Sequence, residues 1–187
     1  MLKNINSYIK VYKKLLSVEY CQSVIEELEL HNWENHEFYH PDWKDDKFKV
    51  YEDAFQVSNR PINSNDDLMK ILWSTIDKYH KELNCTWYNT WSGYRTPRFN
   101  KYTINTSIRK HCDHIQSLFD GTRRGVPILS IVGLLNDDFK GGDFMINDEK
   151  IDLGAGDILM FPSSFLYPHE VLKITEGTRF SFVSWVW

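Results

Sequence analysis

The sequence has few of the features that mark whole classes of proteins. Its 187 residues contain three cysteines, Cys21, Cys85 and Cys112, which lie far apart. This odd, scattered set suggests neither a disulfide framework nor a cysteine-based zinc site, and a reducing compartment such as the cytoplasm fits best. No run of apolar residues approaches the roughly 20 that span a membrane. Lysines also interrupt segment 1–16, so it lacks the apolar stretch of a signal peptide.

The sequence also lacks an excess of basic over acidic residues. The 22 lysines and arginines are outnumbered by 26 aspartates and glutamates, which gives a formal net charge of −4. The chain as a whole therefore has no attraction for nucleic acid or for an anionic membrane. Internal repeats and flexible linkers are absent, and 187 residues with 42% hydrophobic side chains fit one core. We expect a single domain, residues 1–187, that is a monomer or a weak oligomer and has neither nucleic acid nor a membrane as partner.

Two helices are expected before residue 84. Ser17 is placed to cap a helix that ends near Leu30. The segment Ser64–Asp67 has the form of a capping box, and a second helix is expected from there to Leu83. Between them, residues 31–46 are rich in aromatic side chains without a period, which indicates a loop. Together with the residues up to Tyr51, this loop is a candidate lid over a substrate. The apolar positions that recur at helical spacing are Cys21, Val24, Ile25 and Leu28 in the first helix, and Leu68, Ile71, Leu72, Thr75, Ile76, Tyr79 and Leu83 in the second.

The remaining segments have the short apolar or alternating pattern of strands, separated by glycine-rich turns. Many short strands of this kind indicate a barrel or a jelly roll. We predict a mostly β fold with flanking helices, in which residues 1–83 are a helical support and residues from about 84 to 187 form the jelly-roll core. The strand-like runs cover residues 8–12, 48–57, 87–106, 107–113, 126–135, 143–147, 157–161, 169–174 and 178–187.

One short motif, His36-Glu37-Phe38-Tyr39-His40, matches the HExxH pattern of zinc proteases, in which both histidines lie on one helical face. Pro41 disfavours helical geometry at His40, where such a helix has to continue. Asn59 stands where the third zinc ligand of one such class falls. We interpret the match as a coincidence and keep a zinc protease as a distant alternative.

A second histidine motif, His111-Cys112-Asp113, has the spacing that suits a strand. Alternation sends the imidazole and the carboxylate to the same face, with Cys112 pointing away. His169 follows 58 residues after His111, at the start of another strand-like run. Two histidines and one carboxylate are the facial triad of non-haem Fe(II) oxygenases. These three residues are a candidate site for one metal ion; on this motif alone, the default interpretation is that they are unrelated polar residues at strand ends.

Arg179, ten residues after His169, lies on a strand-like run whose same face carries Ser181, Val183 and Trp185. A buried arginine is costly unless it is paired. A bound dicarboxylate would pair with it through bidentate hydrogen bonds. The alternative is a salt bridge to a carboxylate of the protein, such as Asp143 or Asp157. We favour the interpretation in which Arg179 pairs with a bound dicarboxylate.

At this point the chain resembles the 2-oxoglutarate/Fe(II)-dependent oxygenases, and among them the prolyl 4-hydroxylase-like branch. The resemblance rests on an ordered set of motifs with the family's approximate spacing and spans nearly the whole chain. The motifs are His111-x-Asp113, Leu135-Asn136-Asp137-Asp138-Phe139 with Gly141-Gly142-Asp143, Gly156-Asp157 through Phe161-Pro162-Ser163, His169-x-Val171, and Gly177-x-Arg179-x-Ser181.

The resemblance implies a double-stranded β-helix, cupin-like core and a role for each matching residue. His111, Asp113 and His169 would bind Fe(II), and Arg179 would bind the distal carboxylate of 2-oxoglutarate. Tyr102 and Ser181 would complete the cosubstrate site. The implied reaction consumes O2, hydroxylates a C–H bond and releases succinate and CO2, with ascorbate as a candidate reductant.

The implied substrate is a prolyl residue in a peptide or protein. Pro127 stands where the family has an arginine, and Arg123 and Arg124 lie three or four residues earlier. These two arginines and Trp185 are the candidate substrate contacts. Hydroxylation of a free amino acid or other small molecule is the closest alternative, and a cupin-like binding module without catalysis is a distant one. A nucleic-acid demethylase is disfavoured, because Trp185 stands where such enzymes have a second arginine.

Overall fold

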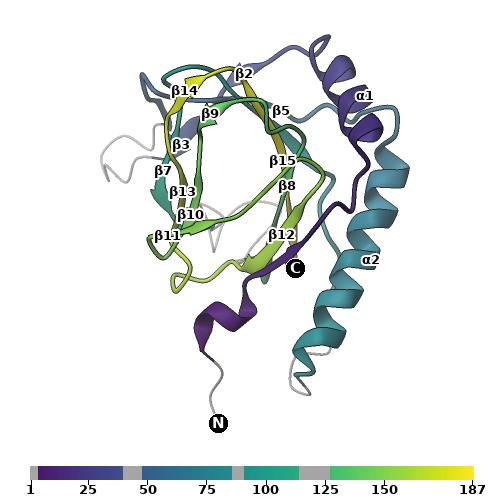
Figure 1. Cartoon of the computed structure of the whole chain (residues 1–187). Coiled ribbons are helices and arrows are strands. Elements are labelled where there is room, and N and C mark those ends of the chain that lie inside the picture. Colours follow the sequence, from purple (N-terminus) through teal and green to yellow (C-terminus); the bar gives the residue numbers. More distant parts are fainter. Residues whose placement is uncertain (1–3, 40–47, 86–90, 114–126) are drawn as a thin grey trace.

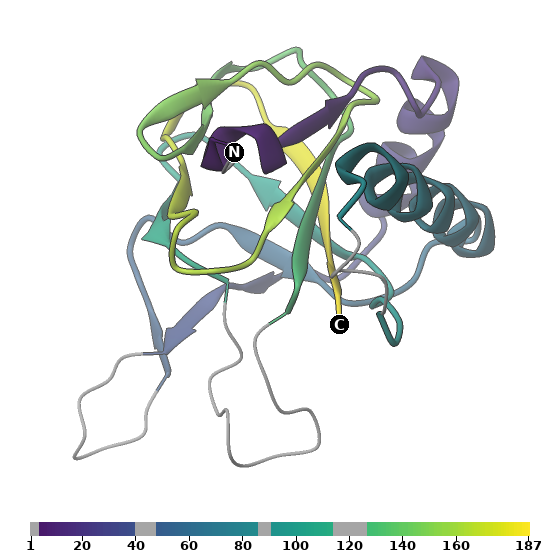
Figure 2. The ribbon, with the colours of Figure 1, turned by 90° about the horizontal axis from the view of Figure 1, so that it is seen from below.

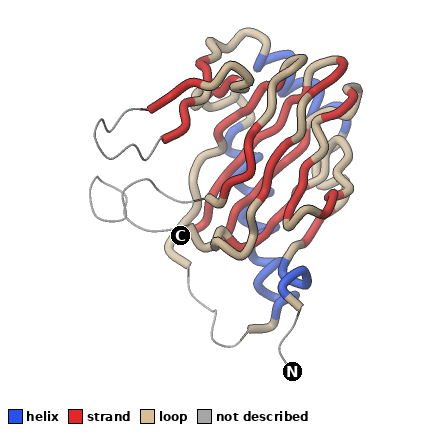
Figure 3. Tube along the Cα trace, turned by 90° about the vertical axis from the view of Figure 1, so that its left-hand side faces the viewer, coloured by secondary structure: helices blue, strands red, loops and turns tan. Residues whose placement is uncertain are grey.

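The computed structural model describes residues 4–39, 48–85, 91–113 and 127–187, which form a jelly roll with helices on one side. Figure 1 looks along the jelly roll, and α1 and α2 lie outside it, against the side that contains β8 and β15. Figure 3 shows the strands running side by side, with the helices behind them. The predicted fold class, a mostly β double-stranded β-helix core with two supporting helices, is confirmed.

The larger sheet has seven strands in the order β1-β12-β8-β15-β6-β5-β2, and all of its neighbouring pairs are antiparallel. In that order the strands are β1 (Lys10–Tyr12), β12 (Ile158–Pro162), β8 (Leu129–Leu134), β15 (Arg179–Val186), β6 (Arg98–Tyr102), β5 (Gln56–Ser58) and β2 (Glu34–Asn35).

The facing sheet has four strands in the order β11-β10-β13-β7, and two small pairs complete the fold. Of the small pairs, β3 with β4 forms the hairpin that leads into one of the grey segments in Figure 2. The bounds are β11 (Glu149–Ile151), β10 (Phe144–Ile146), β13 (His169–Val171), β7 (Ile108–His111), β14 (Ile174–Glu176) with β9 (Lys140–Gly141), and β3 (Glu37–Tyr39) with β4 (Phe48–Val50).

Both predicted helices form, after a short 3-10 helix η1 (Ile5–Tyr8). In α1 (Val18–Leu28) the Ser17 side chain accepts a hydrogen bond from the backbone N–H of Tyr20, as an N-cap residue does. In α2 (Asn65–Leu83), however, the predicted capping box is wrong, because the Ser64 hydroxyl makes no cap hydrogen bond and donates instead to the Tyr20 hydroxyl at 3.0 Å. Ser64 therefore ties the two helices together.

Two clusters of buried side chains fill the molecule, on opposite faces of the larger sheet. One lies between the helices and the sheet, and Phe180 and Phe182 of β15 point into it. The other lies inside the jelly roll. Alternation along β15 turns Ser181 and Val183 to the interior. The helices thus cover one face of β15, while its other face is available for a site.

Four sequence-based expectations need correction. Within the expected loop 31–46, residues 34–35 and 37–39 form β2 and β3, since β2 pairs with β5 and so extends the large sheet. The expected single strand 48–57 is split into β4 and β5. Strands β9 and β11 were not expected. Segment 1–83 also contributes β1, β2 and β5 to the larger sheet, so it is more than a helical support.

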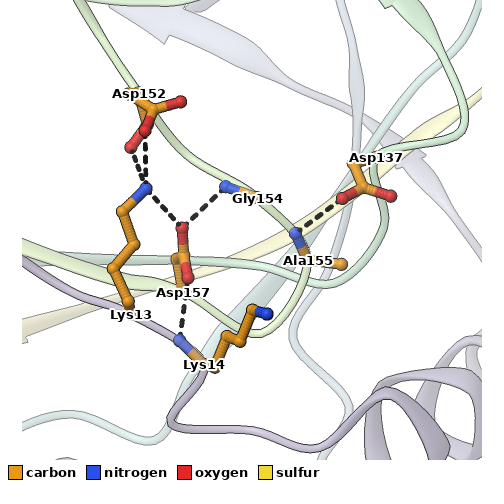
Figure 4. A network of polar contacts seen from close by, with 7 residues as sticks. All are labelled: Lys13, Lys14, Asp137, Asp152, Gly154, Ala155 and Asp157. Atoms are coloured by element: carbon orange, nitrogen blue, oxygen red, sulfur yellow. Dashed lines mark hydrogen bonds and ion pairs between the residues drawn. The ribbon is translucent and has the colours of Figure 1, made fainter.

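The N-terminal segment is fastened to the turn before β12 around Asp157 (Figure 4). One carboxylate oxygen accepts the backbone N–H of Lys14 at 2.8 Å, and the other accepts the N–H of Gly154 at 2.7 Å and lies 3.1 Å from the Lys13 ammonium. Gly156, with φ +83°, passes so close to Leu16 that a Cβ atom would stand 2.2 Å from its carbonyl oxygen. This turn therefore requires glycine.

The described helices include none with the length and apolar character needed to cross a membrane.

Candidate metal centre

Three of the predicted site residues, His111, Asp113 and His169, come together at one point inside the jelly roll. His111 ends β7 and His169 begins β13, and the two residues are partners across the antiparallel ladder. Asp113 follows β7 by two residues. One ligand atom from each lies within 4.8 Å of the others. In the part of the chain that the structure describes, this is the only such group of three or more histidine, cysteine or acidic side chains.

Hydrogen bonds on the far side of each imidazole fix which nitrogen faces the centre. The Nδ1 of His111 lies 2.7 Å from the carbonyl oxygen of Arg109, and the Nδ1 of His169 lies 3.1 Å from that of Tyr167. Because a carbonyl only accepts, Nδ1 is the protonated nitrogen in both neutral rings, and Nε2 keeps its lone pair. The two Nε2 atoms lie 3.6 and 3.7 Å from Oδ1 of Asp113.

Hydrogen bonds also fix the orientation of the Asp113 carboxylate. Its Oδ2 accepts hydrogen bonds from the Ser130 hydroxyl at 2.5 Å and from the Trp185 indole N–H at 2.9 Å. The Ser130 hydroxyl in turn lies 2.7 Å from that of Ser163. Oδ1 is thus the oxygen directed at the two histidines, as expected for a metal ligand whose orientation is set by its neighbours.

The protonation states suit a metal. Burial alone raises the pKa of Asp113, but its contacts with the His111 and His169 side chains and with the Ser130 hydroxyl hold it well below its ordinary value. Burial lowers the pKa of His169 to about 4. At neutral pH the site therefore presents a carboxylate and a neutral imidazole, the forms in which these groups bind metals. Two imidazoles and one carboxylate fit Fe(II), as the facial triad requires.

Arg179 is almost completely buried, at 1% exposure, beside this centre. It donates a hydrogen bond to the Ser181 hydroxyl at 2.8 Å, and its guanidinium carbon lies 5.1 Å from the centre of the Tyr102 ring. The carboxylates considered as alternative partners are engaged elsewhere, Asp143 with Lys150 and Asp157 with Lys13. Among the described residues no carboxylate forms an ion pair with Arg179, so the pocket holds a cation that an anionic ligand can pair.

Tyr102 and Ser181, the predicted cosubstrate contacts, line the same cavity as the triad and Arg179. Tyr102 lies opposite Arg179 in the β6–β15 register, and burial raises the pKa of its phenol to about 12, so it is neutral and can donate a hydrogen bond. Trp185 also lines the cavity. Alternation along β15 had predicted that it shares a face with Arg179 and Ser181.

Other residues that the sequence singled out do not join this group. The candidate substrate contacts Arg123 and Arg124 lie outside the described residues, as does His40 of the HExxH motif. His36 stacks on the Phe55 ring at 4.6 Å, and Glu37 begins the β3 strand. The helix on which a zinc protease depends is therefore not formed there.

The sequence reading missed two polar residues of the cavity, Arg98 and Asn100 of β6. A signal was available, because both alternate with Tyr102 and so share its face. Ser130, which binds the Asp113 carboxylate, was missed as well. Nothing in its local sequence distinguishes it from the other buried residues of β8.

Comparisons with known proteins agree with this geometry. Residues 97–187 match the 2OG-Fe(II) oxygenase superfamily. A PKHD-type hydroxylase of Acinetobacter baumannii is 38% identical over 97 residues, which cover 48% of this chain and 42% of that protein. A PKHD-type hydroxylase of Prochlorococcus marinus is 25% identical over 149 residues, covering 77% of this chain and 66% of that protein. The match thus spans less than half the length of the Acinetobacter relative.

Two solved structures have a similar fold. A Trichoplax adhaerens prolyl hydroxylase, in complex with a hypoxia inducible factor peptide fragment, has a TM-score of 0.68 at 17% identity, covering 96% of this chain and 83% of that chain. A Pseudomonas putida prolyl-4-hydroxylase has a TM-score of 0.64 at 17% identity, covering 96% and 91%. The 2OG-Fe(II) oxygenase superfamily that residues 97–187 match implies Fe(II) as the metal and 2-oxoglutarate and O2 as cosubstrates, which the donor set of the cavity fits. Residues 97–187 thus match the 2OG-Fe(II) oxygenase superfamily, and the chain has a fold similar to that of prolyl hydroxylases.

Proposed function

We propose that this chain hydroxylates a prolyl residue of a peptide or protein, using 2-oxoglutarate and O2 and releasing succinate and CO2. His111, Asp113 and His169 hold Fe(II), and Arg179 binds the distal carboxylate of 2-oxoglutarate. The observation that carries this proposal is the shared cavity. It brings a two-histidine, one-carboxylate cluster together with a buried arginine that no described carboxylate pairs.

The roles of the chain's own residues follow from their contacts. When bound, the iron with its cosubstrate supplies the oxidation of a substrate C–H bond by O2. The carbonyl oxygens of Arg109 and Tyr167 keep both Nε2 lone pairs directed inward. Arg179 pairs with the distal carboxylate through charge-assisted hydrogen bonds. The Tyr102 hydroxyl donates to an oxygen of the same cosubstrate, and the burial of Arg179 and His169 keeps bulk water away.

The substrate class rests on analogy of fold. The prolyl hydroxylases of Trichoplax adhaerens and Pseudomonas putida have the same fold, and the former was solved with a peptide fragment. A peptidyl proline is therefore the first substrate to try. The PKHD-type relatives are named as hydroxylases without a substrate. Hydroxylation of a free amino acid is the alternative, and the substrate assay has to distinguish it from hydroxylation of a peptidyl proline.

The cofactor site is tested without knowledge of the substrate. Metal-free protein is titrated anaerobically with Fe(II) and then with 2-oxoglutarate, and the visible metal-to-ligand charge-transfer band of the chelate is recorded. We expect the band in the wild-type protein and its loss in His111→Ala. The control is His80→Ala, on α2 outside the jelly roll (Figure 1). A folded, metal-binding wild-type protein that gives no band would contradict the proposal.

The substrate is tested by turnover. Succinate release that depends on a proline-containing peptide, with the mass of one added oxygen on that proline, is the expected result. Oxygen added to a free amino acid, with no peptide turned over, would keep the iron chemistry and overturn the peptide assignment. Peptide cleavage that survives His169→Ala would instead favour the zinc protease.

A further inference from the structure

Arg98, at the start of β6, stands between the metal cavity and the outside. It lines the cavity that contains the triad and Arg179, and it also lines an open groove of about 600 Å³. Among the residues that the structure describes, Arg98 is the only one common to the two linings. The Arg98 side chain therefore lies where the groove and the metal cavity adjoin. The groove is lined by Glu34, Asn35, His36, Glu37, Val50, Val57, Asn59, Arg95 and Arg98.

The strand register separates Arg98 from the cosubstrate arginine. On the β6–β15 ladder Tyr102 pairs with Arg179, whereas Arg98 pairs with Val183. Four residue steps along a strand correspond to about 13 Å. Arg98 instead approaches Trp185, whose ring centre is 5.3 Å from the guanidinium carbon and whose indole N–H binds the metal ligand Asp113. Arg179 and Arg98 therefore start from backbone positions about 13 Å apart along the strands, and a group bound on Arg98 lies in the same cavity as the metal centre.

The charge of Arg98 has no anion to balance it among the described residues. Its Nε is buried without a hydrogen-bond partner, and no ion pair connects the guanidinium to a described carboxylate. The nearest candidate, Asp113, has its Oδ2 occupied by Ser130 and Trp185 and its Oδ1 directed at the histidines. Burial lowers the pKa of Arg98, yet an arginine remains charged. Arg98 is half-buried, so its guanidinium can reach a ligand, and its unpartnered Nε offers a charge-assisted hydrogen bond to an anion.

From this geometry we propose that Arg98 is a specificity-determining residue that binds a carboxylate of the substrate, within a residue or two of the carbon that is hydroxylated. The inference rests on the proposed hydroxylase function and specifies its substrate class. A carboxylate is the anion chosen, because a single planar guanidinium matches it bidentately. Two sources have this chemistry, the C-terminal carboxylate of a chain that ends at the target proline and an acidic side chain next to an internal proline.

Matched probes separate these sources. The first pair is a short peptide that ends in proline, with either a free carboxylate or an amide at its C-terminus. The second pair is an amide-capped peptide in which an internal proline is followed by glutamate or by glutamine. Binding of each peptide to the protein loaded with Fe(II) and 2-oxoglutarate is measured anaerobically by calorimetry, so that the readout does not depend on turnover.

For at least one pair, we expect the wild-type protein to bind the carboxylate form about 10- to 100-fold more tightly than its neutral partner. In Arg98→Met this preference falls to about onefold, and Arg98→Lys keeps part of it. The pair that shows the preference identifies the source. Arg95→Met is the matched control, since Arg95 lines the same groove and lies over the same Trp185 ring at 5.8 Å. It should keep the preference.

Several results would overturn the inference. These are no carboxylate preference in either pair, an unchanged preference in Arg98→Met, or an equal loss in Arg95→Met. A charge-transfer band that weakens in Arg98→Met would also overturn it, by moving Arg98 to the cosubstrate. Failure of the proposed function is a different observation, since it removes the band from the wild-type protein itself. Circular dichroism of each variant verifies its fold.

Discussion

Two charged side chains at the larger sheet are buried to the same degree, but the chain supplies partners for one charge and almost none for the other. Asp157, just before β12, is 2% exposed, and Arg179, at the start of β15, is 1% exposed. Around Asp157 the chain supplies two backbone N–H groups and the ammonium of Lys13 (Figure 4). Around Arg179 it supplies one hydroxyl, that of Ser181. The charge balanced by its own chain fastens the fold, whereas the unbalanced charge is the one to which we assign a ligand.

The largest expected effect follows from removing the unbalanced charge. Arg179→Met should weaken the binding of 2-oxoglutarate to the iron-loaded protein by about 2–5 kcal/mol, or about 30-fold and more, because the distal carboxylate loses its partner. The melting temperature of the ligand-free protein should not fall, since an uncompensated buried charge is removed. The charge-transfer band and calorimetric melting measure the two effects.

Arg60→Met, an exposed substitution, is the control for Arg179→Met and should change neither quantity. The comparison fails if Arg179→Met lowers the melting temperature while the affinity for 2-oxoglutarate is unchanged. Arg179 would then be a structural residue, like Asp157.

The opposite pattern is expected at the balanced charge. Asp157→Ala leaves the N–H groups of Lys14 and Gly154 without an acceptor, so the free energy of unfolding should fall by about 3 kcal/mol. The folded fraction should bind 2-oxoglutarate as the wild type does. Asp152→Ala is the matched control, because Asp152 also contacts Lys13 but its side chain is 97% exposed. Equal losses in the two variants, measured by urea unfolding, would contradict the assignment.

The metal centre also makes the stability of the metal-free protein depend on pH. Burial lowers the pKa of His169 from 6.5 to about 4, so between these values the unfolded chain binds more protons than the folded one. Stability is complete above pH 6.5 and falls as the pH is lowered, by about 2 kcal/mol at pH 5 from this residue. Burial lowers the pKa of His36 to about 3, which adds a loss of the same sign.

Urea unfolding of metal-free protein at pH 7 and at pH 5 measures this dependence. His169→Gln should retain a smaller difference between the two pH values, which comes from His36 and the other titrating groups. Stability that is constant or that rises on acidification would show that His169 is not held neutral by its surroundings.

The sequence predicted those parts of the site that depend on local repeats. Alternation placed Arg179, Ser181 and Trp185 on one face of a strand, and the structure has all three lining one cavity. The helical spacing likewise identified the buried face of α2, with Leu68 and Leu83 at its two ends. Such features follow from the period of 2 residues in a strand and of 3.6 residues in a helix, and each period can be recognised within one segment of the sequence.

What escaped prediction depends on partners far away in the sequence. The capping box at Ser64 was read from four residues, but its hydroxyl binds Tyr20, 44 positions earlier. Strand β2 exists because β5 pairs with it. Arg98 shares the face of Tyr102, yet its position over Trp185 depends on the pairing of β6 with β15. Local pattern fixes which way a side chain points, and tertiary pairing decides what it meets.

The smallest expected effect concerns Trp185, which the sequence suggested as a substrate contact. Its indole N–H donates to Oδ2 of Asp113 at 2.9 Å, so it orients a carboxylate that we assign to iron. Trp185→Phe keeps the ring and removes the donor. Loss of such an orienting hydrogen bond should weaken Fe(II) binding about 10- to 100-fold, with 2-oxoglutarate binding at saturating iron unchanged.

Ser130→Ala removes the other hydrogen bond to the same oxygen of Asp113 and should act in the same direction as Trp185→Phe. Trp73→Phe, on the exposed side of α2, should have no effect on iron affinity. If Trp185→Phe instead left iron affinity unchanged and raised the KM of the peptide, Trp185 would be a substrate contact. The orientation of the Asp113 carboxylate would then depend on the Ser130 hydroxyl, the other donor to its Oδ2.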